Sequence, residues 1–367
     1  MTNRIRVLAF SPIPEEGAGC RFRIAQFIPY LATVGIDVTL DSLFTTEFFR
    51  LVYRPGRYLQ KAATFAGLSI KRLAALRDAA QFDLIFIYRE MFPIGPAAIE
   101  RLLTMRGRPP VVFDFDDALF LPSVSDANRL IAVLKQPQKI ESIISRSDHV
   151  IAGNDYLSAY ARRFNPAVTM IPTSVDTDRF APLDGACASK KTTAPPIIGW
   201  IGSPTTASYI RGLAGVLRQV RERHNFVLRV SGTGEPLEIP GVQVENETWT
   251  LAREVELFNG CDIGVYPLAD DEWSKGKCGF KAIEFMACGV PVVAANRGAL
   301  PETAAPAATL VDPDDEEALA EALLEIATNE DLREGMAIDA LAHAAPFTWQ
   351  RTAELTDAAI ARVTGDG

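Results

Sequence analysis

The stretch from Lys275 to Glu302 reads KGKCGFKAIEFMACGVPVVAANRGALPE and joins a predicted helix to an apolar strand. Gly279 stands where the helix begins, Glu284 lies inside it, and Gly289 stands at its end, where a left-handed residue often closes a helix. The run VPVVAA that follows is apolar on both faces, as is typical of a parallel strand covered by helices. A helix that only packs against a sheet needs neither the first glycine nor the carboxylate, so the stretch predicts a ligand-binding helix.

Short apolar runs alternate with helical segments along most of the chain. Six strand-like runs precede a segment rich in proline and small residues, Asp176 to Pro196, and six follow it. Repeated strand–helix units predict parallel, doubly wound sheets. We therefore expect an α/β protein with two Rossmann-like domains facing a cleft. The strand-like runs begin at Ile5, Ile36, Asp83, Pro110, His149, Val168, Pro196, Phe226, Val242, Ile263, Val290 and Ala308.

The predicted domain boundaries follow from this pattern. The first domain covers residues 1–178, a linker covers 179–195, and the second domain covers 196–346. The last helical segment, 347–364, either packs on the second domain or returns to the first.

The bulk composition excludes several classes of protein. The net charge of the 367 residues is -9, which disfavours nucleic-acid binding by the whole surface. No apolar run is long enough to span a bilayer, and the first residues read as a strand rather than a signal peptide. The five cysteines form no C-x-x-C pair and the three histidines are far apart, so no metal site is expected. These features predict a cytoplasmic protein with reduced thiols.

Two loops after predicted strands have the composition of phosphate-binding loops. In GSPTT, Gly202 turns the chain, and a helix predicted to start near Pro204 offers free amides beside the Ser203 hydroxyl. The same residues also suit an ordinary turn with a serine cap. In VSGTGEP, Gly234 would let a ligand approach the backbone, but Leu237 stands where a dinucleotide fingerprint requires glycine. A nicotinamide dinucleotide is therefore disfavoured.

The predicted helix of the opening stretch has its own phosphate-binding chemistry. The Gly279 amide can meet a diphosphate at the helix start. Lys277 and Lys281 are four residues apart and are expected on one helical face. The Glu284 carboxylate can accept hydrogen bonds from both hydroxyls of a ribose diol.

The stretch CGFKAIEFMACGVPVVAANRGALPE resembles the signature of GT-B fold glycosyltransferases, especially the retaining family 4 group. Members of that group carry E-G-F-G, four residues, and then E-A-M-A-C-G-x-P-V-V-A. The resemblance covers most of the chain and is firmest over 199–302. It implies that a sugar moves from a nucleotide diphosphate sugar to a hydroxyl of a glycan or lipid-linked glycan, with retention and without a metal or other cofactor. It also implies that Glu284 holds the nucleotide ribose and that 298–302 lies near the nucleotide.

The sequence departs from the family pattern at one glutamate. The family often has a second glutamate eight residues before Glu284, and this chain has Gly276 there. Either Lys277 and Lys281 take over the donor diphosphate, or the donor sits differently. Two phosphates need positive charge, and GSPTTASY supplies none before Arg211, so we expect the two lysines to be catalytic. The expected donor-binding residues are Gly202, Ser203, Gly234, Gly279, Phe280 and Glu284.

By the same resemblance the first domain binds the acceptor. A flexible turn ends at Gly19, before a helix predicted to start near Arg21. This first loop lines the cleft in related enzymes, so Gly19 and Arg21 are expected to bind substrate. Asp116 stands close to the place of a histidine found in many relatives, so it is expected to be catalytic, although one aspartate here could simply cap a helix. Asn154 and Thr173 match the family's turns at later strand ends and are expected to bind substrate.

Residues 48–77 form a basic segment in an acidic chain. The segment has no Asp or Glu, and aromatic and aliphatic residues alternate with its cations. Basic amphipathic segments dock on anionic bilayers, although a solvated basic face has the same composition. A role in polysaccharide biosynthesis, on the inner face of the cytoplasmic membrane, would fit the first interpretation. The cations are Arg50, Arg54, Arg57, Lys61, Lys71, Arg72 and Arg77.

Two other functions fit the same sequence. A nucleotide-sugar epimerase on this fold would need no acceptor, but the near lack of histidine counts against its acid–base chemistry. A non-catalytic subunit that binds a nucleotide sugar is compatible with Gly276 in place of a glutamate.

Overall fold

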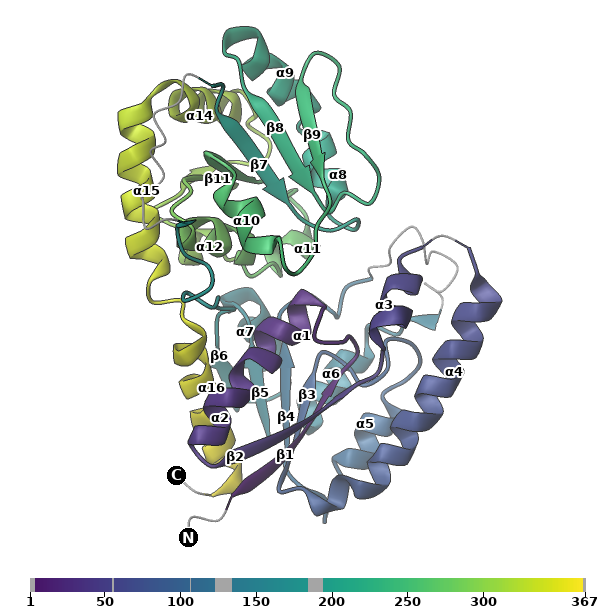
Figure 1. The fold of residues 1–367 in the computed structure, drawn as a ribbon. Helices are drawn as coiled ribbons and strands as arrows, with labels where there is room; N and C mark the ends of the chain where they lie inside the picture. The colour runs from purple at the N-terminus through teal and green to yellow at the C-terminus, as the bar shows by residue number, and fades with distance from the viewer. Residues whose placement is uncertain (1–3, 55, 106, 123–133, 184–193, 366–367) are drawn as a thin grey trace. The chain divides into compact units, whose positions relative to one another are not determined.

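The computed structural model describes residues 4–54, 56–105, 107–122, 134–183 and 194–365. The chain forms two compact units, shown in Figure 1. The first unit comprises residues 1–173 and 349–367, and the second comprises 174–348. Each unit contains a six-stranded parallel sheet with helices, so the prediction of two doubly wound α/β domains is confirmed.

The sheet of the first unit has the strand order β2-β1-β3-β4-β5-β6. Strands β3 and β4 are buried along their whole length, which explains why their sequences lack a polar face. The order reverses direction between β1 and β3, and ligands of open α/β sheets bind at such a point. The strands are β1 Ile5–Ser11, β2 Ile36–Ser42, β3 Leu84–Tyr88, β4 Val111–Phe115, β5 His149–Ala152 and β6 Val168–Met170.

Helix α16, Trp349–Thr364, packs on the first unit although it ends the chain. Its Ala353 and Ile360 side chains belong to the same core as Val7 and Phe86 of the sheet. The other helical segments of this unit are α1 Ala18–Arg23, η1 Ala25–Phe27, α2 Ile28–Thr33, α3 Thr46–Val52, α4 Tyr58–Ala75, η2 Leu76–Gln81, α5 Ala98–Leu103, α6 Lys139–Arg146 and α7 Asp155–Arg162.

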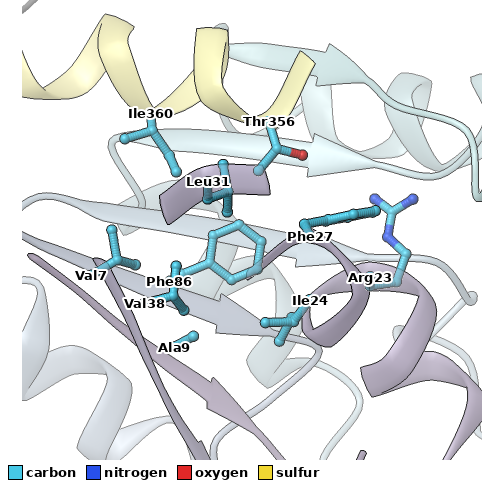
Figure 2. A pocket seen from close by; sticks show the side chains of 10 residues that line it. All are labelled: Val7, Ala9, Arg23, Ile24, Phe27, Leu31, Val38, Phe86, Thr356 and Ile360. Carbon is cyan, nitrogen blue, oxygen red and sulfur yellow. The ribbon is translucent and has the colours of Figure 1, made fainter. Parts of the chain in front are cut away.

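A small cavity lies in this core, where α16 and the first helices meet the sheet (Figure 2). Its lining is mostly aliphatic and aromatic, including Phe27, Leu31 and Phe86. Arg23 reaches it from one side and Thr356 from another. The composition is that of a packing defect in a hydrophobic core, so we do not assign a substrate to it.

The sheet of the second unit has the order β12-β11-β10-β7-β8-β9. Its strands are β7 Ile197–Ile201, β8 Val227–Ser231, β9 Gln243–Glu247, β10 Ile263–Tyr266, β11 Val292–Ala295 and β12 Thr309–Val311. Its helices are α8 Ala207–Gly212, α9 Ala214–Arg223, α10 Glu254–Asn259, α11 Glu272–Lys275, α12 Phe280–Ala287, α13 Leu300–Thr303, α14 Glu316–Thr328 and α15 Glu330–Ala344.

Glycines in two central strands let α12 lie close to this sheet. A Cβ atom on Gly264 of β10 would lie 2.6 Å from the Phe285 ring, and one on Gly199 of β7 would lie 3.5 Å from it. Larger side chains at the first position would therefore push the helix away. Because α12 follows β10, its amino end lies at the carboxyl edge of the sheet, where ligands bind in this class of fold.

Two local predictions need correction or detail. Helix α8 begins at Ala207, and residues 204–206 form a turn, so the prediction of a helix start near Pro204 was wrong.

The residues before 184 pack on α10: the Asn259 Nδ2 donates to the Ala181 carbonyl at 3.1 Å, and the Leu183 N–H donates to Asn259 Oδ1 at 2.9 Å. Residues 184–193 of the predicted linker lie outside the described residues.

Candidate active site

The loops after β7 and β8 contact each other backbone to backbone in the second unit. Gly232 has a φ of +87°, and a Cβ atom there would lie 2.2 Å from the Gly202 carbonyl oxygen. The Ser203 N–H donates to Thr206 Oγ1 at 3.1 Å. A Cβ atom on Gly234 would lie 3.1 Å from Pro204, so the structure brings the predicted residues Gly202, Ser203 and Gly234 together.

The chain before α12 is held by the loop after β11. Gly279 has a φ of +68°, a conformation that side chains other than glycine rarely adopt. A Cβ atom there would lie 2.4 Å from Thr303 Oγ1. The Ala299 N–H donates to the Lys277 carbonyl at 3.0 Å. The GALPE turn therefore lies against the start of α12.

Lys277 does not share a helical face with Lys281. Helix α12 begins at Phe280, and Lys277 lies in the coil between α11 and α12. That prediction was wrong because Gly279, in a left-handed conformation, sets the helix start beyond Lys277. The Lys277 ammonium instead lies over the Trp273 ring, 5.2 Å from its centroid.

Glu284 is fully buried, so it is not the solvated carboxylate of an ordinary surface helix. Its Oε2 atom lies 2.6 Å from the Lys281 Nζ atom, one helical turn away. The Lys281 Nζ atom also lies 4.0 Å from Oε1 of Glu254, another buried carboxylate. The proposed ribose ligand is therefore part of an ionic cluster rather than a solitary group.

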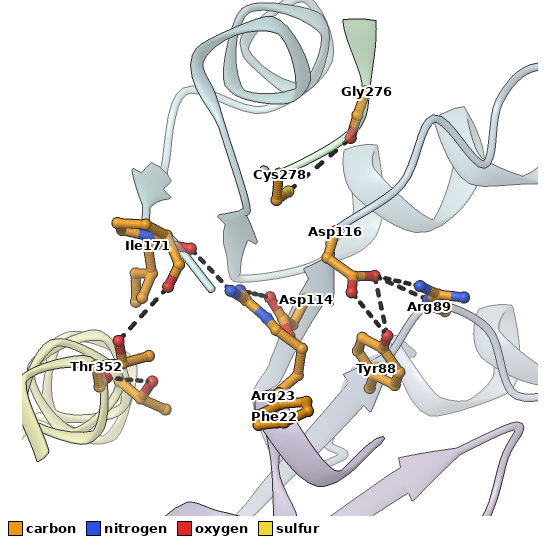
Figure 3. Close-up of polar contacts among 12 residues, drawn as sticks. Phe22, Arg23, Tyr88, Arg89, Asp114, Asp116, Ile171, Gly276, Cys278 and Thr352 are labelled. Carbon is orange, nitrogen blue, oxygen red and sulfur yellow. Dashed lines mark hydrogen bonds and ion pairs between the residues drawn. The ribbon is translucent and has the colours of Figure 1, made fainter. Parts of the chain in front are cut away.

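In the first unit, Asp116 lies in a polar network at the carboxyl edge of β3 and β4 (Figure 3). The Tyr88 hydroxyl donates to Asp116 Oδ1 at 2.9 Å, and Arg89 Nε donates to the same oxygen at 2.8 Å. Arg89 also pairs with Asp117 at 2.6 Å. A Cβ atom on Gly19 would lie 2.1 Å from the Tyr88 hydroxyl, so the predicted residues Gly19 and Asp116 meet through Tyr88.

Tyr88 and Arg89 were not among the residues predicted from the sequence. Tyr88 ends the buried run that forms β3, and Arg89 directly follows it. Polar residues at the end of an apolar run were the sequence signal that could have identified them. Arg89 has a φ of +61°, and strained residues of this kind gather at functional sites. Burial raises the pKa of the Tyr88 phenol well above its ordinary value, so this hydroxyl remains a hydrogen-bond donor at neutral pH.

Three other predicted residues of the first unit are buried. Asn154 caps α7, because its Oδ1 accepts the Leu157 N–H at 2.8 Å. The Arg21 guanidinium lies over the Phe22 ring, 4.6 Å from its centroid. Among the described residues, Thr173 Oγ1 has no hydrogen-bond partner. The Asn154 contact is sufficient to explain that residue as a helix cap.

Two of the seven cations in the basic segment, Lys61 and Arg72, are buried in the first unit. The prediction that the whole segment forms a basic surface was therefore wrong for these two residues. The Lys61 Nζ donates to the Val52 carbonyl at 3.0 Å. Arg72 Nη1 donates to the Met91 carbonyl at 2.9 Å, and its Nη2 donates to Asp41 Oδ1 at the same distance. The Arg72 acceptors, Asp41 and Met91, lie outside the segment, so the burial of this cation was not visible in the composition.

The described part of the chain contains no group of three or more His, Cys, Asp or Glu residues arranged to hold a metal ion. Among the described helices, none combines the length and hydropathy needed to cross a bilayer.

Comparison with known proteins gives the family. Residues 195–329 match the family described as "Glycosyl transferases group 1". The D-inositol 3-phosphate glycosyltransferase of Nocardia farcinica is 30% identical, over 96% of this chain and 88% of that protein. The chain belongs to the group 1 glycosyltransferases. Three further relatives of the same name match over only 50–57% of their own length.

Solved structures show the fold of this chain. Sucrose-phosphate synthase from Thermosynechococcus elongatus superimposes with a TM-score of 0.72 at 18% identity, over 99% of this chain and 100% of that one. Anabaena HepE in complex with UDP-glucose superimposes with a TM-score of 0.66 at 17% identity, over 98% and 100%. The two sheets of this chain are therefore those of the GT-B fold.

Proposed function

We propose that this glycosyltransferase moves a sugar from a nucleoside diphosphate sugar to a hydroxyl of a glycan or lipid-linked glycan. The observation that carries the proposal is the start of α12, where the left-handed Gly279 precedes a helix that contains the buried Glu284. The solved Anabaena HepE structures contain UDP or UDP-glucose, which supports a donor of this class.

The donor would bind the second unit. The amides at the start of α12 and the Lys277 ammonium would face the diphosphate, with Ser203 beside it, and Glu284 would accept the ribose hydroxyls. In the reaction the bond from the anomeric carbon to the diphosphate oxygen breaks, a bond to the acceptor oxygen forms, and the acceptor hydroxyl gives its proton to a base, for which Asp116 is the proposed group. Negative charge grows on the leaving diphosphate, and preorganised amides and an ammonium stabilise it without a divalent ion. The configuration would be retained, as in the resembling group.

The acceptor would bind the first unit near Gly19 and Asp116. Tyr88 and Arg89 hold the Asp116 carboxylate from two sides, so it is oriented before an acceptor arrives. One of its lone pairs would accept the hydrogen bond of the reacting hydroxyl. Asp116→Asn should lower turnover by about 10²-fold or more, while the affinity for nucleotide alone stays within twofold.

Incubation with radiolabelled UDP-, GDP- and dTDP-sugars tests the function. Nucleotide release that depends on an added acceptor supports transfer. A sugar isomer formed without acceptor would instead show an epimerase, and binding without turnover would show a non-catalytic subunit. Lys277→Ala is expected to lower turnover, whereas Glu284→Gln should mainly weaken nucleotide binding.

We further propose that the outer face of α3 and α4 contacts an anionic bilayer that carries a lipid-linked acceptor. Leu59 and Ile70 on this face are 89% and 69% exposed. Five basic residues on α3, on α4 and in the segments next to them are also exposed, and each basic residue near an anionic surface contributes about 1 kcal/mol. Those residues are Arg50, Arg54, Arg57, Lys71 and Arg77. The acidic residues Glu47 and Asp78 lie just outside residues 48–77 in the sequence.

Flotation with vesicles tests this surface. Vesicles with anionic lipid should carry the protein upward in a salt-sensitive manner, and purely zwitterionic vesicles should not. Leu59→Ser with Ile70→Ser should abolish flotation. Ile338→Ser, at another exposed apolar position on α15, is the matched control and should leave it unchanged. No flotation of the wild type with anionic vesicles would remove the membrane proposal.

A further inference from the structure

Four charged side chains form a row in the second unit, here called the charge row. Arg179 Nη2 lies 3.4 Å from Glu254 Oε2, and the Lys281 Nζ atom lies 4.0 Å from Glu254 Oε1. The same Nζ atom lies 2.6 Å from Glu284 Oε2. Both carboxylates are buried, with side-chain exposures of 1% and 0%.

The charge row is electrically balanced. Two cations and two anions alternate, and Arg179, whose side chain is 34% exposed, supplies the outer cation. A buried carboxylate without a partner is strongly unfavourable, so each member depends on its neighbours. Glu254 thereby becomes a necessary part of the environment of Glu284, although the two come from different helices.

An aromatic row supports the charge row. The Phe180 and Phe258 ring centroids are 5.8 Å apart, and those of Phe258 and Phe285 are 4.7 Å apart. The Lys281 Nζ atom lies 5.2 Å from the Phe258 centroid. Two carboxylates and an aromatic ring therefore hold the Lys281 ammonium in one position, although the lysine side chain itself is flexible.

We propose that Lys281 and Glu254 are positioning residues for Glu284: Lys281 orients the carboxylate that receives the nucleotide ribose, and Glu254 holds the Lys281 ammonium in place. This inference rests on the proposed function, because it takes Glu284 as the ribose ligand. It replaces the sequence-based expectation that the Lys281 ammonium binds the diphosphate. The diphosphate is left to the α12 amides and Lys277.

Calorimetry with two ligands tests the proposal. UDP or GDP, whichever binds the wild type, is compared with its 2′,3′-dideoxy analogue, and the ratio of their Kd values is the ribose preference. Glu254→Gln should lower the ribose preference by about three- to tenfold, which corresponds to the net contribution of one ordinary hydrogen bond. Lys281→Met should lower it as much, while the affinity for the dideoxy ligand stays within twofold. Glu254→Asp keeps the charge and should restore most of the preference.

Glu256→Gln provides the matched control. Glu256 also lies on α10, but its side chain is 62% exposed and pairs with Arg253. This change should leave the ribose preference unaltered. Thermal unfolding of every variant separates a positioning role from a purely structural one, since a structural role alone lowers Tm without changing the preference. If one of the two test variants does not fold, the other carries the same prediction.

Three results would overturn the proposal. An unchanged ribose preference in Glu254→Gln would remove the role of Glu254. An equal loss of affinity for both ligands in Lys281→Met would place the ammonium on the diphosphate. An unchanged preference in Glu284→Gln would remove Glu284 as the ribose ligand. A wild type that binds no nucleoside diphosphate would differ from all of these, because the proposed function itself would then fail and this inference with it.

Discussion

Arg23 and Asp114 form an ion pair inside the first unit, with side chains that are 2% and 1% exposed. Arg23 Nε donates to Asp114 Oδ2 at 2.9 Å, and its Nη1 donates to the Ile171 carbonyl at 2.8 Å (Figure 3). The pair joins α1 to the end of β4, two residues before Asp116. It therefore fixes the edge of the sheet at which the acceptor is proposed to bind.

Arg23→Met should destabilise the first unit strongly. It leaves the buried Asp114 carboxylate without its cation, and such a loss costs about 3–5 kcal/mol. Chemical unfolding followed by circular dichroism measures the change. Arg6→Met is the control, because the Arg6–Asp83 pair is solvent-exposed and should cost far less. Equal effects of the two substitutions would contradict this account of the buried pair.

Gly279→Ala should weaken nucleotide binding and lower the stability of the second unit. The new Cβ atom would meet Thr303 Oγ1, and the backbone conformation at this position disfavours alanine. Gly67→Ala is the matched control. Gly67 lies inside α4 with no atom within 4 Å of the added Cβ, so alanine there should stabilise by about 0.5–1 kcal/mol. Full nucleotide affinity in Gly279→Ala would argue against the α12 start as the diphosphate site.

His149 should make the first unit less stable in mild acid. Burial, together with the nearby Arg362, lowers the pKa of His149 below its ordinary value. The unfolded chain takes up this proton near pH 6.5, about the ordinary value for histidine. Below that pH, and down to the lowered folded pKa, the unfolded state binds more protons, so stability falls as pH falls.

Comparison with His149→Gln measures this contribution. Glutamine can keep a hydrogen bond to Thr169, whose hydroxyl lies 2.9 Å from His149 Nε2. Unfolding midpoints between about pH 7.5 and pH 5.5 should fall less in the variant than in the wild type. Parallel curves would show that His149 does not contribute to the pH dependence.

The described cysteines should be inert in the native protein. Burial raises the pKa of Cys20 to about 11 and that of Cys261 to about 12, and the thiolate is the reactive species. Cys278 and Cys288 are also buried. Cys187 lies outside the described residues, so Cys187→Ser isolates these four thiols. A thiol reagent should label them only after denaturation, and rapid native labelling of this variant would contradict the prediction.

The strands were predictable because their signal is local. The run PVVFDF contains β4, and VPVVAA contains β11, since buried parallel strands are continuous apolar segments. Three predicted site residues also lie in the expected elements: Gly202 and Ser203 directly follow β7, and Glu284 lies inside α12. Patterns within a few residues of sequence were sufficient for these features.

The side-chain partners were not predictable in the same way. Lys281 pairs with Glu254, which lies on a different helix, and Arg72 bonds to the Met91 carbonyl nineteen residues away. Tyr88 acquires its role only when β3 and β4 lie side by side and Asp116 comes within reach. Such contacts depend on tertiary packing, which spacing along one segment does not encode.

Hydrogen–deuterium exchange with and without a nucleoside diphosphate sugar tests the central claim most directly. We expect slower exchange on donor binding in residues 199–206 and 276–284 of the second unit, and loss of that protection in Glu284→Gln. Protection confined to other segments, or no change with any UDP-, GDP- or dTDP-sugar, would contradict the assignment of the donor site.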